Sequence, residues 1–372
     1  MIKRILILGG YGNFGRFIAK CLARDEAIQL ILAGRHIGKA KDLARRLNSV
    51  HFPETVYCDI QHNLNQVLEE MSPDVVIHTS GPFQKQGYQV PEACIKNGCH
   101  YIDLADARDY VANIEQLDIK AKANNLLLVS GASSVPGLSS AIIEHYLPQF
   151  YRLESIEYAI ATAQLTNQGL ATTAGVLSYA GKPFFTLKHG EKKVIYGWQG
   201  LRLKKFWHLN RRLLGNCDIP DLDLFPKCYP RLKNIKFQAG LELKVLHLGL
   251  YFLSWFVRLN LLPSLDRFAS FLLKFSRWFD VFGHNNTGFY MLLQGKNAEG
   301  IEKKIQFDLY AEKGDGLYIP CMPAVLLAKK LTHENLSTRG AMACVGLVSL
   351  QEYLDALKNF GLDIIWRENM ED

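Results

Sequence analysis

A glycine-rich turn near the start of the chain has the spacing of a pyrophosphate-binding loop. Gly10, Gly12 and Gly15 fit the pattern G-x-G-x-x-G between an apolar, strand-like run and a helix-like stretch. The first glycine permits the tight turn, the second lets the backbone approach a pyrophosphate, and the third lets the helix lie close to its strand. The alternative is a strand-turn-helix unit without a ligand. We predict a dinucleotide, with its phosphates at the helix N-terminus, at Gly10, Tyr11, Gly12, Asn13, Phe14 and Gly15.

The residues after the second strand-like run indicate which dinucleotide binds. Proteins that bind NAD carry an acidic residue about 20 residues past the glycine pattern, where it holds the ribose 2′-hydroxyl. Here that place is taken by Arg35, and Lys39 follows one helical turn later. A guanidinium binds a 2′-phosphate in bidentate fashion and gains little from a hydroxyl. The sequence therefore favours NADP(H) over NAD(H), with a solvated pair of cations at a helix start as the alternative.

The composition fits a globular protein of two domains with reduced thiols. At 372 residues the chain is long enough for two cores, and it enters an apolar strand at once, which leaves no room for a signal peptide. We expect a cytoplasmic protein. Eight cysteines are scattered without a CxxC pair, and Cys94, Cys99 and His100 have no second pair of ligands nearby. We therefore expect no metal site.

Positive charge is concentrated in one stretch. The net charge is +7, and residues 182–240 hold 13 Lys/Arg against 4 Asp/Glu. Such a patch can attract phosphates, acidic substrates or anionic lipid, although a solvated face is the commoner explanation. We predict a small-molecule substrate and no nucleic-acid partner.

Strand-like and helix-like segments alternate through the first third of the chain. Apolar runs at 29–34, 55–58, 74–79, 100–104 and 126–129 follow the first strand. This rhythm predicts an α/β Rossmann fold, a doubly wound parallel sheet of six strands. Ligands of such sheets bind outside the carboxyl ends of the strands. The segments expected at that edge, beside the glycine turn, are Ser80–Phe83, Asp103–Asp106 and Ser130–Ser134.

Several motifs together resemble the saccharopine dehydrogenase-like oxidoreductases. They are G-Y-G-N-F-G, A-G-R, S-G-P-F-x-x-x-G, A-C-I-K-N-G-C-H-Y-I-D-L-A-D and S-G-A-S-S-V-P-G, all within about the first 140 residues. The resemblance implies an NADP-binding domain, and it implies roles at further positions. Arg35 would hold the 2′-phosphate and Asp59 would lie by the adenine. Asp103 would sit at the mouth of the catalytic crevice. The nicotinamide half would be lined by Ser80, Gly81, Pro82 and Phe83.

Hydride transfer needs an acid or base within hydrogen-bond reach of the substrate heteroatom. The best-placed carboxylates are Asp103 and Asp106, with Tyr101 behind them. We predict these three as catalytic candidates; the alternative is that Asp103 caps a helix or fixes its loop. Ser133 is predicted to bind the nicotinamide amide, or else, like Ser134, to cap the helix that follows.

The remainder of the chain is predicted to form an α+β domain for substrate binding or dimerisation. The boundaries expected are 1–135 for the Rossmann domain, 136–319 for the second domain, and 320–372 for helices that return to the first. A mixed or antiparallel sheet is indicated by an antiparallel pair at 289–294 and 304–311. In 304–311 apolar and polar residues alternate, which predicts one buried and one wet face.

The segment 245–282 is unusually rich in apolar and aromatic residues. Ten uncharged residues at 248–257 are too few to span a bilayer, and a helix with aromatic residues beside Lys and Arg follows. We weigh three interpretations: a helical hairpin packed on its own domain or on a second subunit, a membrane-surface helix, or a flap over a hydrophobic substrate. Hence a homo-oligomer and a peripheral membrane contact through 248–279 are both expectations.

Three functions from different classes remain at this point. The first is an NADP(H)-dependent oxidoreductase acting on an amino-acid-derived C–N substrate, as the resemblance implies. The second is an enoyl-type reductase acting on a lipid-like substrate, motivated by the aromatic segment. The third is a non-catalytic NADP(H)-binding protein that responds to redox state. Fold alone does not decide among them.

Overall fold

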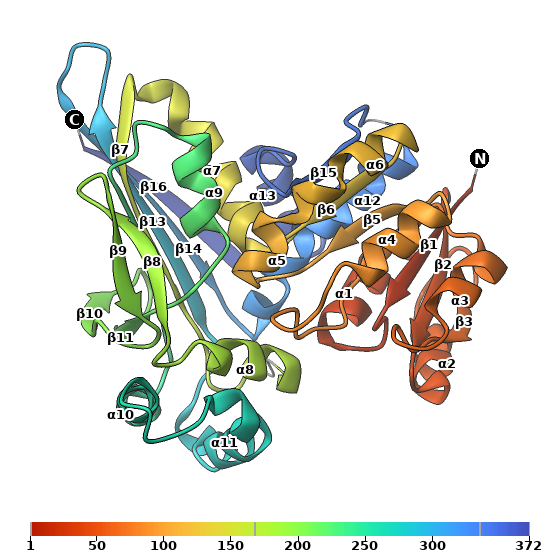
Figure 1. The fold of residues 1–372 in the computed structure, drawn as a ribbon, viewed down its shortest axis with the longest axis horizontal. Helices are drawn as coiled ribbons and strands as arrows, with labels where there is room; N and C mark the ends of the chain where they lie inside the picture. Colours follow the sequence, from red (N-terminus) through yellow and green to blue (C-terminus); the bar gives the residue numbers. More distant parts are fainter. Residues whose placement is uncertain (1, 167–168, 335, 372) are drawn as a thin grey trace. The chain divides into compact units, whose positions relative to one another are not determined.

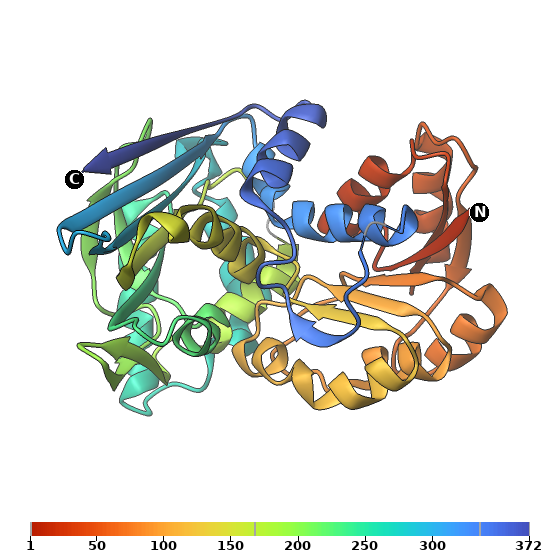
Figure 2. The same ribbon diagram turned by 90° about the horizontal axis from the view of Figure 1, so that it is seen from above.

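The computed structural model describes residues 2–166, 169–334 and 336–371. The chain divides into two units. Unit 1 comprises Met1–Ala141 and Tyr318–Ala356, and unit 2 comprises Ile142–Leu317 and Leu357–Asp372. Figures 1 and 2 show their ribbons from two directions.

Unit 1 contains a seven-stranded sheet in which every pair of neighbouring strands is parallel. Its strands are β15 (Gly340–Ala343), β6 (Leu127–Ser130), β5 (His100–Asp103), β4 (Val75–His78), β1 (Lys3–Leu8), β2 (Ile28–Gly34) and β3 (Glu54–Tyr57), in spatial order. The order reverses direction between β1 and β4, as in a doubly wound sheet, so the predicted Rossmann fold is confirmed. Six strands were expected. The seventh, β15, is a short run of small residues that gives almost no periodic signal.

Helices cover both faces of this sheet (Figure 2). They are α1 (Asn13–Leu22), α2 (Ile37–Arg46), α3 (Leu64–Met71), α4 (Gln89–Lys96), α5 (Arg108–Ala112), α6 (Asp118–Ala123), α12 (Met322–Thr332) and α13 (Leu350–Asn359), whose last turn belongs to unit 2. In α1 the apolar side chains Phe17, Ile18 and Leu22 are buried, as their helical spacing predicts. On the other face, α3, α4 and α6 share a core with Leu6 and Val76 of the strands.

Unit 2 is built on a mixed sheet of seven strands. Its strands are β10 (Arg202–Lys205), β11 (Arg211–Asn216), β12 (Asn234–Gly240), β7 (Arg152–Ala161), β13 (Thr287–Lys296), β14 (Glu302–Ala311) and β16 (Ile364–Glu371), in spatial order, and only β12 and β7 are parallel. A separate hairpin is formed by β8 (Pro183–Lys188) and β9 (Glu191–Tyr196). The helices are α7 (Ser139–Tyr146), α8 (Gly169–Ser178), α9 (Asp221–Cys228), α10 (Lys244–Arg258) and α11 (Ala269–Arg277).

The C-terminal end of the chain differs from the expectation. Residues 320–372 were expected to be helices that return to the first domain, and α12 and the first part of α13 do lie in unit 1. The last residues instead form β16, which pairs antiparallel with β14. Without β16, β14 would present an unpaired edge. An ion pair between the half-exposed Arg367 and the buried Asp308 supports the register, because Arg367 Nε lies 2.9 Å from Asp308 Oδ2.

The alternation expected in β14 is also incomplete. Asp308 and Tyr310 were assigned to a wet face, but both are buried. Arg367 pairs with Asp308, and Tyr310 packs into a core cluster with Phe206 and Leu209 from the connection after β10. Side chains from elsewhere in the chain thus cover the second face of β14, and this tertiary packing overrides the alternation expected from the local sequence.

Candidate functional site

The glycine turn joins β1 to α1 with almost no free space. Gly9 has φ +77°, a left-handed conformation that favours glycine, and its carbonyl accepts the N–H of Gly12 at 2.8 Å. A Cβ at Gly15 would lie 2.4 Å from the Gly9 oxygen and 2.8 Å from Gly10 Cα. The third glycine thus lets α1 press against the turn, as its position predicts. The left-handed bend falls on Gly9, one residue before the pattern.

The N-terminus of α1 is uncapped. Its N-cap residue is Gly12, which supplies no side-chain cap, and the first turn contains no acid. The positive end of the helix is therefore not neutralised from within the turn. A helix N-terminus without an acid, and a backbone without side chains at Gly10 and Gly12, fit the pyrophosphate of a dinucleotide.

Tyr11 connects the glycine turn to the end of β2. Its hydroxyl accepts the N–H of His36 at 3.0 Å. A Cβ at Gly34 would lie 2.6 Å from a carbon of the Tyr11 ring, so Gly34 makes room for the ring. Sequence reasoning placed Tyr11 in the loop but did not assign Gly34, whose only signal is the A-G-R motif.

Arg35 and Lys39 lie exposed where β2 gives way to α2. Neither forms an ion pair with a carboxylate in the part of the chain that the structure describes. The first turn of α2 holds no acid, and its N-cap, His36, makes no side-chain cap. Two uncompensated cations beside a free helix N-terminus fit a phosphate monoester. Contact with a 2′-phosphate remains a prediction.

Asp59 follows the neighbouring strand β3 and is half-buried. Its Oδ1 accepts the N–H of Gln61 at 3.1 Å, and its own N–H donates to Asn63 Oδ1 at 2.8 Å. The carboxylate thus shapes the turn after β3. Its predicted place beside the adenine is not tested by these contacts.

The loop after β4 contacts the glycine turn across the point where the strand order reverses. A Cβ at Gly9 would lie 2.7 Å from Ser80 Oγ. Gln86 Nε2 donates to the carbonyl oxygens of Ser80 at 2.8 Å and Pro82 at 3.0 Å, which holds the loop in shape. Gly81 is half-buried and Pro82 is exposed. Phe83 instead points inward, with its ring 4.9 Å from that of His78.

Asp103 is completely buried at the end of β5. Its Oδ1 accepts three hydrogen bonds, from Ala105 N at 2.9 Å, Gly131 N at 2.8 Å and Ser130 Oγ at 3.0 Å. Oδ2 has no partner among the described residues. Burial raises the pKa of Asp103 to about 6, although these hydrogen bonds act in the opposite direction. The carboxylate therefore fastens the end of β5 to that of β6.

Tyr101 belongs to a buried chain of polar groups that sequence reasoning did not identify. Its hydroxyl lies 3.1 Å from His78 Nδ1 and 3.0 Å from the Tyr110 hydroxyl. Burial lowers the pKa of His78 to about 3, so the imidazole is neutral, and its Nε2 has no partner among the described residues. The signal for His78 was a lone histidine closing an apolar strand, which is more often structural than catalytic.

Asp106 and Ser133 occupy different surroundings. Asp106 is partly exposed and accepts a hydrogen bond from Gln84 Nε2 at 3.0 Å. Ser133 is buried, and its N–H donates to the Gly131 carbonyl at 2.7 Å. Among the three catalytic candidates, Asp106 alone presents accessible surface in the structure.

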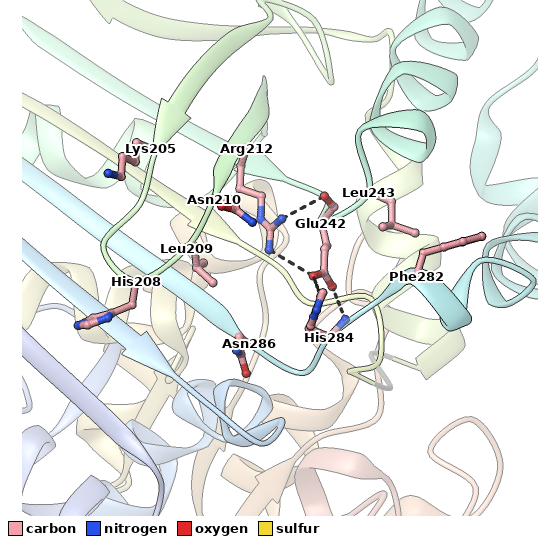
Figure 3. A pocket seen from close by; sticks show the side chains of 10 residues that line it. All are labelled: Lys205, His208, Leu209, Asn210, Arg212, Glu242, Leu243, Phe282, His284 and Asn286. Atoms are coloured by element: carbon pink, nitrogen blue, oxygen red, sulfur yellow. Dashed lines mark hydrogen bonds and ion pairs between the residues drawn. The ribbon is translucent and has the colours of Figure 1, made fainter.

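Unit 2 contains a cavity of about 520 Å³ (Figure 3). It lies between the connection from β10 to β11, the residues just before α10 and the residues that follow α11. Its polar lining consists mainly of Lys205, His208, Asn210, Arg212, Glu242 and His284. Lys205 and Arg212 come from the basic stretch 182–240. None of these six residues was singled out from the sequence.

A buried ion pair forms the wall of this cavity (Figure 3). Arg212 donates to the Glu242 carbonyl oxygen at 3.2 Å and to Oε1 at 3.4 Å, while its Nε has no partner among the described residues. Burial alone would raise the pKa of Glu242, but the backbone N–H groups of Gln164 and His284, the His284 ring and Arg212 lower it. The carboxylate is thus saturated and the guanidinium is not. Arg212 can bind a further anion.

No cluster of three or more potential metal ligands occurs among the described residues. None of the helices described there has the length and apolarity needed to cross a membrane.

Comparison with known proteins identifies the first part of the chain. Residues 5–176 match the family model of the saccharopine dehydrogenase NADP binding domain. A search of curated proteins finds no match. The sequence resemblance is thereby confirmed for the nucleotide-binding domain.

Two solved structures share the fold. Apo saccharopine dehydrogenase (L-Glu forming) from Saccharomyces cerevisiae is similar over 100% of both chains, with 13% identity and a TM-score of 0.69. Amine dehydrogenase from Mycobacterium smegmatis is similar over 92% of this chain and 95% of its own, with 10% identity and a TM-score of 0.50. At such identities the likeness establishes the two-part fold and leaves the substrate open.

Proposed function

We propose that this chain, whose residues 5–176 match the family model of the saccharopine dehydrogenase NADP binding domain, is an NADP(H)-dependent oxidoreductase. The observation that carries the proposal is the cationic edge of unit 1. An uncapped helix N-terminus follows the glycine turn, and Arg35 and Lys39 stand exposed with no acid in the adjoining helical turn. Both features favour a dinucleotide with an additional phosphate.

Replacing Arg35 with Ala tests the cofactor preference. We expect the Kd for NADPH to rise roughly 10- to 100-fold, since charge-assisted hydrogen bonds contribute about 1.5–3 kcal/mol. The Kd for NADH should not change. Both can be measured by titration calorimetry.

The matched control is Arg46→Ala, which removes an exposed arginine from the opposite end of α2. Equal affinity of the wild type for NADPH and NADH, or equal losses in the two variants, would refute a 2′-phosphate contact at Arg35.

When bound, NADP(H) supplies the hydride chemistry, and the chain must position the substrate and handle a proton. Asp103 and Tyr101 are buried in hydrogen-bonded arrangements, whereas Asp106 is accessible. Asp106 is accordingly the candidate with the readiest access for proton transfer at a substrate nitrogen.

The cavity in unit 2 supports an amino-acid-derived substrate. A buried guanidinium with an unused donor, in a cavity that Lys205 also lines, is suited to a carboxylate. An enoyl thioester or long acyl chain would not satisfy Arg212. We therefore place oxidation or reduction of a C–N bond in a carboxylate-bearing substrate ahead of the other functions.

A substrate screen tests this order. NADPH absorbance is followed with amines plus oxo acids in one set and long-chain enoyl compounds in the other. We expect turnover in the first set. For the substrate found, Arg212→Gln should raise KM roughly 10- to 100-fold by loss of a charged hydrogen bond, and Arg211→Gln, at the exposed neighbouring position, should not.

Lys205→Gln provides a check that leaves the buried Arg212–Glu242 pair intact. It should also raise KM, by a smaller factor because Lys205 is exposed. Turnover of enoyl compounds alone would favour the lipid-like substrate, for which the exposed aromatic residues of α10 and α11 are the supporting observation. NADPH binding without turnover in either set would favour the non-catalytic alternative.

A further inference from the structure

The outward face of α10 is an apolar stripe. Its members recur every three or four residues, so they lie on one side of the helix. They are Val245, Leu248, Phe252, Phe256 and Leu259, all exposed. His247, Ser254 and Val257 are buried on the other side, and they attach the helix to its unit. The packing of α10 on unit 2 therefore does not require the exposed stripe.

The second helix repeats this arrangement. Phe268, Phe271, Phe275 and Trp278 are spaced by three or four residues in and beside α11, and Trp278 is 78% exposed. Their rings form a ladder, with centroids 6.4 Å apart for Phe271 and Phe275 and 5.7 Å apart for Phe275 and Trp278. Val281 follows and is 82% exposed. Phe271, Phe275 and Trp278 thus contact one another along an exposed face of the helix.

Both helices lie at the same end of unit 2, beside α8 (Figure 1). Of the 26 exposed large apolar side chains among the described residues, twelve lie between Val245 and Phe282. That stretch is about a tenth of the chain, so exposed apolar surface is concentrated there several-fold. Concentrated patches of this kind mark interaction surfaces, whereas scattered exposed residues need no explanation.

The charges around the stripes are predominantly positive. Residues 244–282 contain five Lys/Arg and two Asp. All five cations are exposed, and Lys274 and Arg277 directly precede Phe275 and Trp278. One of the acids, Asp280, accepts a hydrogen bond from Gln164 Nε2 at 2.8 Å. Helices that lie in the plane of an anionic bilayer surface typically combine aromatic residues with neighbouring cations.

We propose that α10 and α11, with the residues just after them, bind the surface of a bilayer that contains anionic lipid. The aromatic stripes enter the headgroup region, and Lys274 and Arg277 contact lipid phosphates. A second copy of the chain fits less well. A twofold contact through the same patch would bring these cations against their own counterparts with few acids to offset them. The proposal does not depend on the reaction that the enzyme catalyses.

Flotation of the full-length protein with vesicles tests the proposal. The vesicles contain phosphatidylcholine, either alone or mixed with phosphatidylserine. We expect the protein to float with the mixed vesicles, to float less with phosphatidylcholine alone, and to be released by salt. The double substitution Phe271→Ser/Trp278→Ser should lower the partition coefficient about tenfold or more, since each removes a large apolar group from the interface.

The matched control is Phe52→Ser/Ile119→Ser, which removes two apolar side chains of unit 1 that are 70% and 84% exposed. It should float like the wild type. NADPH affinity, measured on every variant, should stay unchanged and shows that each has folded.

Reversal of charge is the second test. Lys274→Glu/Arg277→Glu should abolish the preference for phosphatidylserine while leaving the apolar stripes in place. The proposal is overturned if the wild type stays at the bottom of the gradient with both vesicles, or if both double variants of α11 float like the wild type. A dimer in solution that Phe271→Ser/Trp278→Ser dissociates would reassign the surface to a second copy and would equally overturn it.

Discussion

Gly15→Ala is expected to abolish tight NADPH binding. The new Cβ would lie 2.4 Å from the Gly9 carbonyl oxygen and 2.8 Å from Gly10 Cα, both backbone atoms that cannot rotate away. The turn or the helix must move, and the N–H groups proposed to bind the pyrophosphate move with it. Loss of two charge-assisted hydrogen bonds, each contributing about 1.5–3 kcal/mol, raises the Kd on the order of 100-fold or more.

The direction of the effect on stability makes this test specific. Alanine in place of glycine within a helix normally stabilises it by about 1 kcal/mol. In α1 we expect the opposite, a lower Tm, because overpacking costs about 1–3 kcal/mol. The matched control is Gly249→Ala in helix α10 of unit 2, where the added Cβ meets no atom within 4 Å. A Gly15→Ala protein with wild-type Tm and NADPH affinity would contradict the close packing.

Substitutions of Asp103 are expected to have the second large effect, and Asp103→Ala and Asp103→Asn should differ in the free energy of unfolding. Asp103→Ala removes the acceptor of three buried donors, which belong to Ala105, Ser130 and Gly131. Each unsatisfied donor costs about 1–3 kcal/mol, so the free energy of unfolding should fall by several kcal/mol. In Asp103→Asn the Oδ1 acceptor is kept, and the amide NH₂ takes the place of Oδ2, which has no partner among the described residues. This variant should fold.

Turnover of Asp103→Asn then separates the two roles of this carboxylate. We expect activity to persist, as for a positioning residue whose hydrogen bonds survive. Complete loss of turnover in a stable Asp103→Asn protein with normal NADPH affinity would instead establish the catalytic role predicted from the sequence. In the expected case, the search for the acid or base moves to Asp106.

The pH dependence of stability provides an independent readout. Burial raises the pKa of Asp103 to about 6 from its ordinary value of 3.8. The folded protein therefore binds a proton between these values that the unfolded chain does not, so stability falls as pH rises from about 4 to 6. The contribution is on the order of 3 kcal/mol. Asp103→Asn should lack it, and thermal unfolding of both proteins at about pH 4 and about pH 7.5, at the lower end of that window and above its upper end, measures the difference.

Local sequence was sufficient for the nucleotide edge of unit 1. The glycine turn and Arg35 lie within one strand-helix-strand unit, where a few consecutive residues set the backbone path. The same reasoning failed at positions whose surroundings come from elsewhere in the chain. Asp308 was expected on a wet face, but Arg367, 59 residues later, covers it. Tyr310, assigned to the same face, is buried in a cluster with Phe206 and Leu209.

The sequence by itself determined the Rossmann fold and the glycine turn between β1 and α1, because spacing along a short stretch of chain dictates these features, and it predicted a preference for a phosphorylated dinucleotide. Only the tertiary structure joined Arg212, Glu242 and His284, which are 30 and 42 residues apart, into one wall of a cavity. It also decided that Asp103 is buried among backbone donors and that the aromatic stripes of α10 and α11 stay exposed. Long-range contacts set burial, and burial determines whether a carboxylate holds a loop in place and whether an apolar face requires a partner.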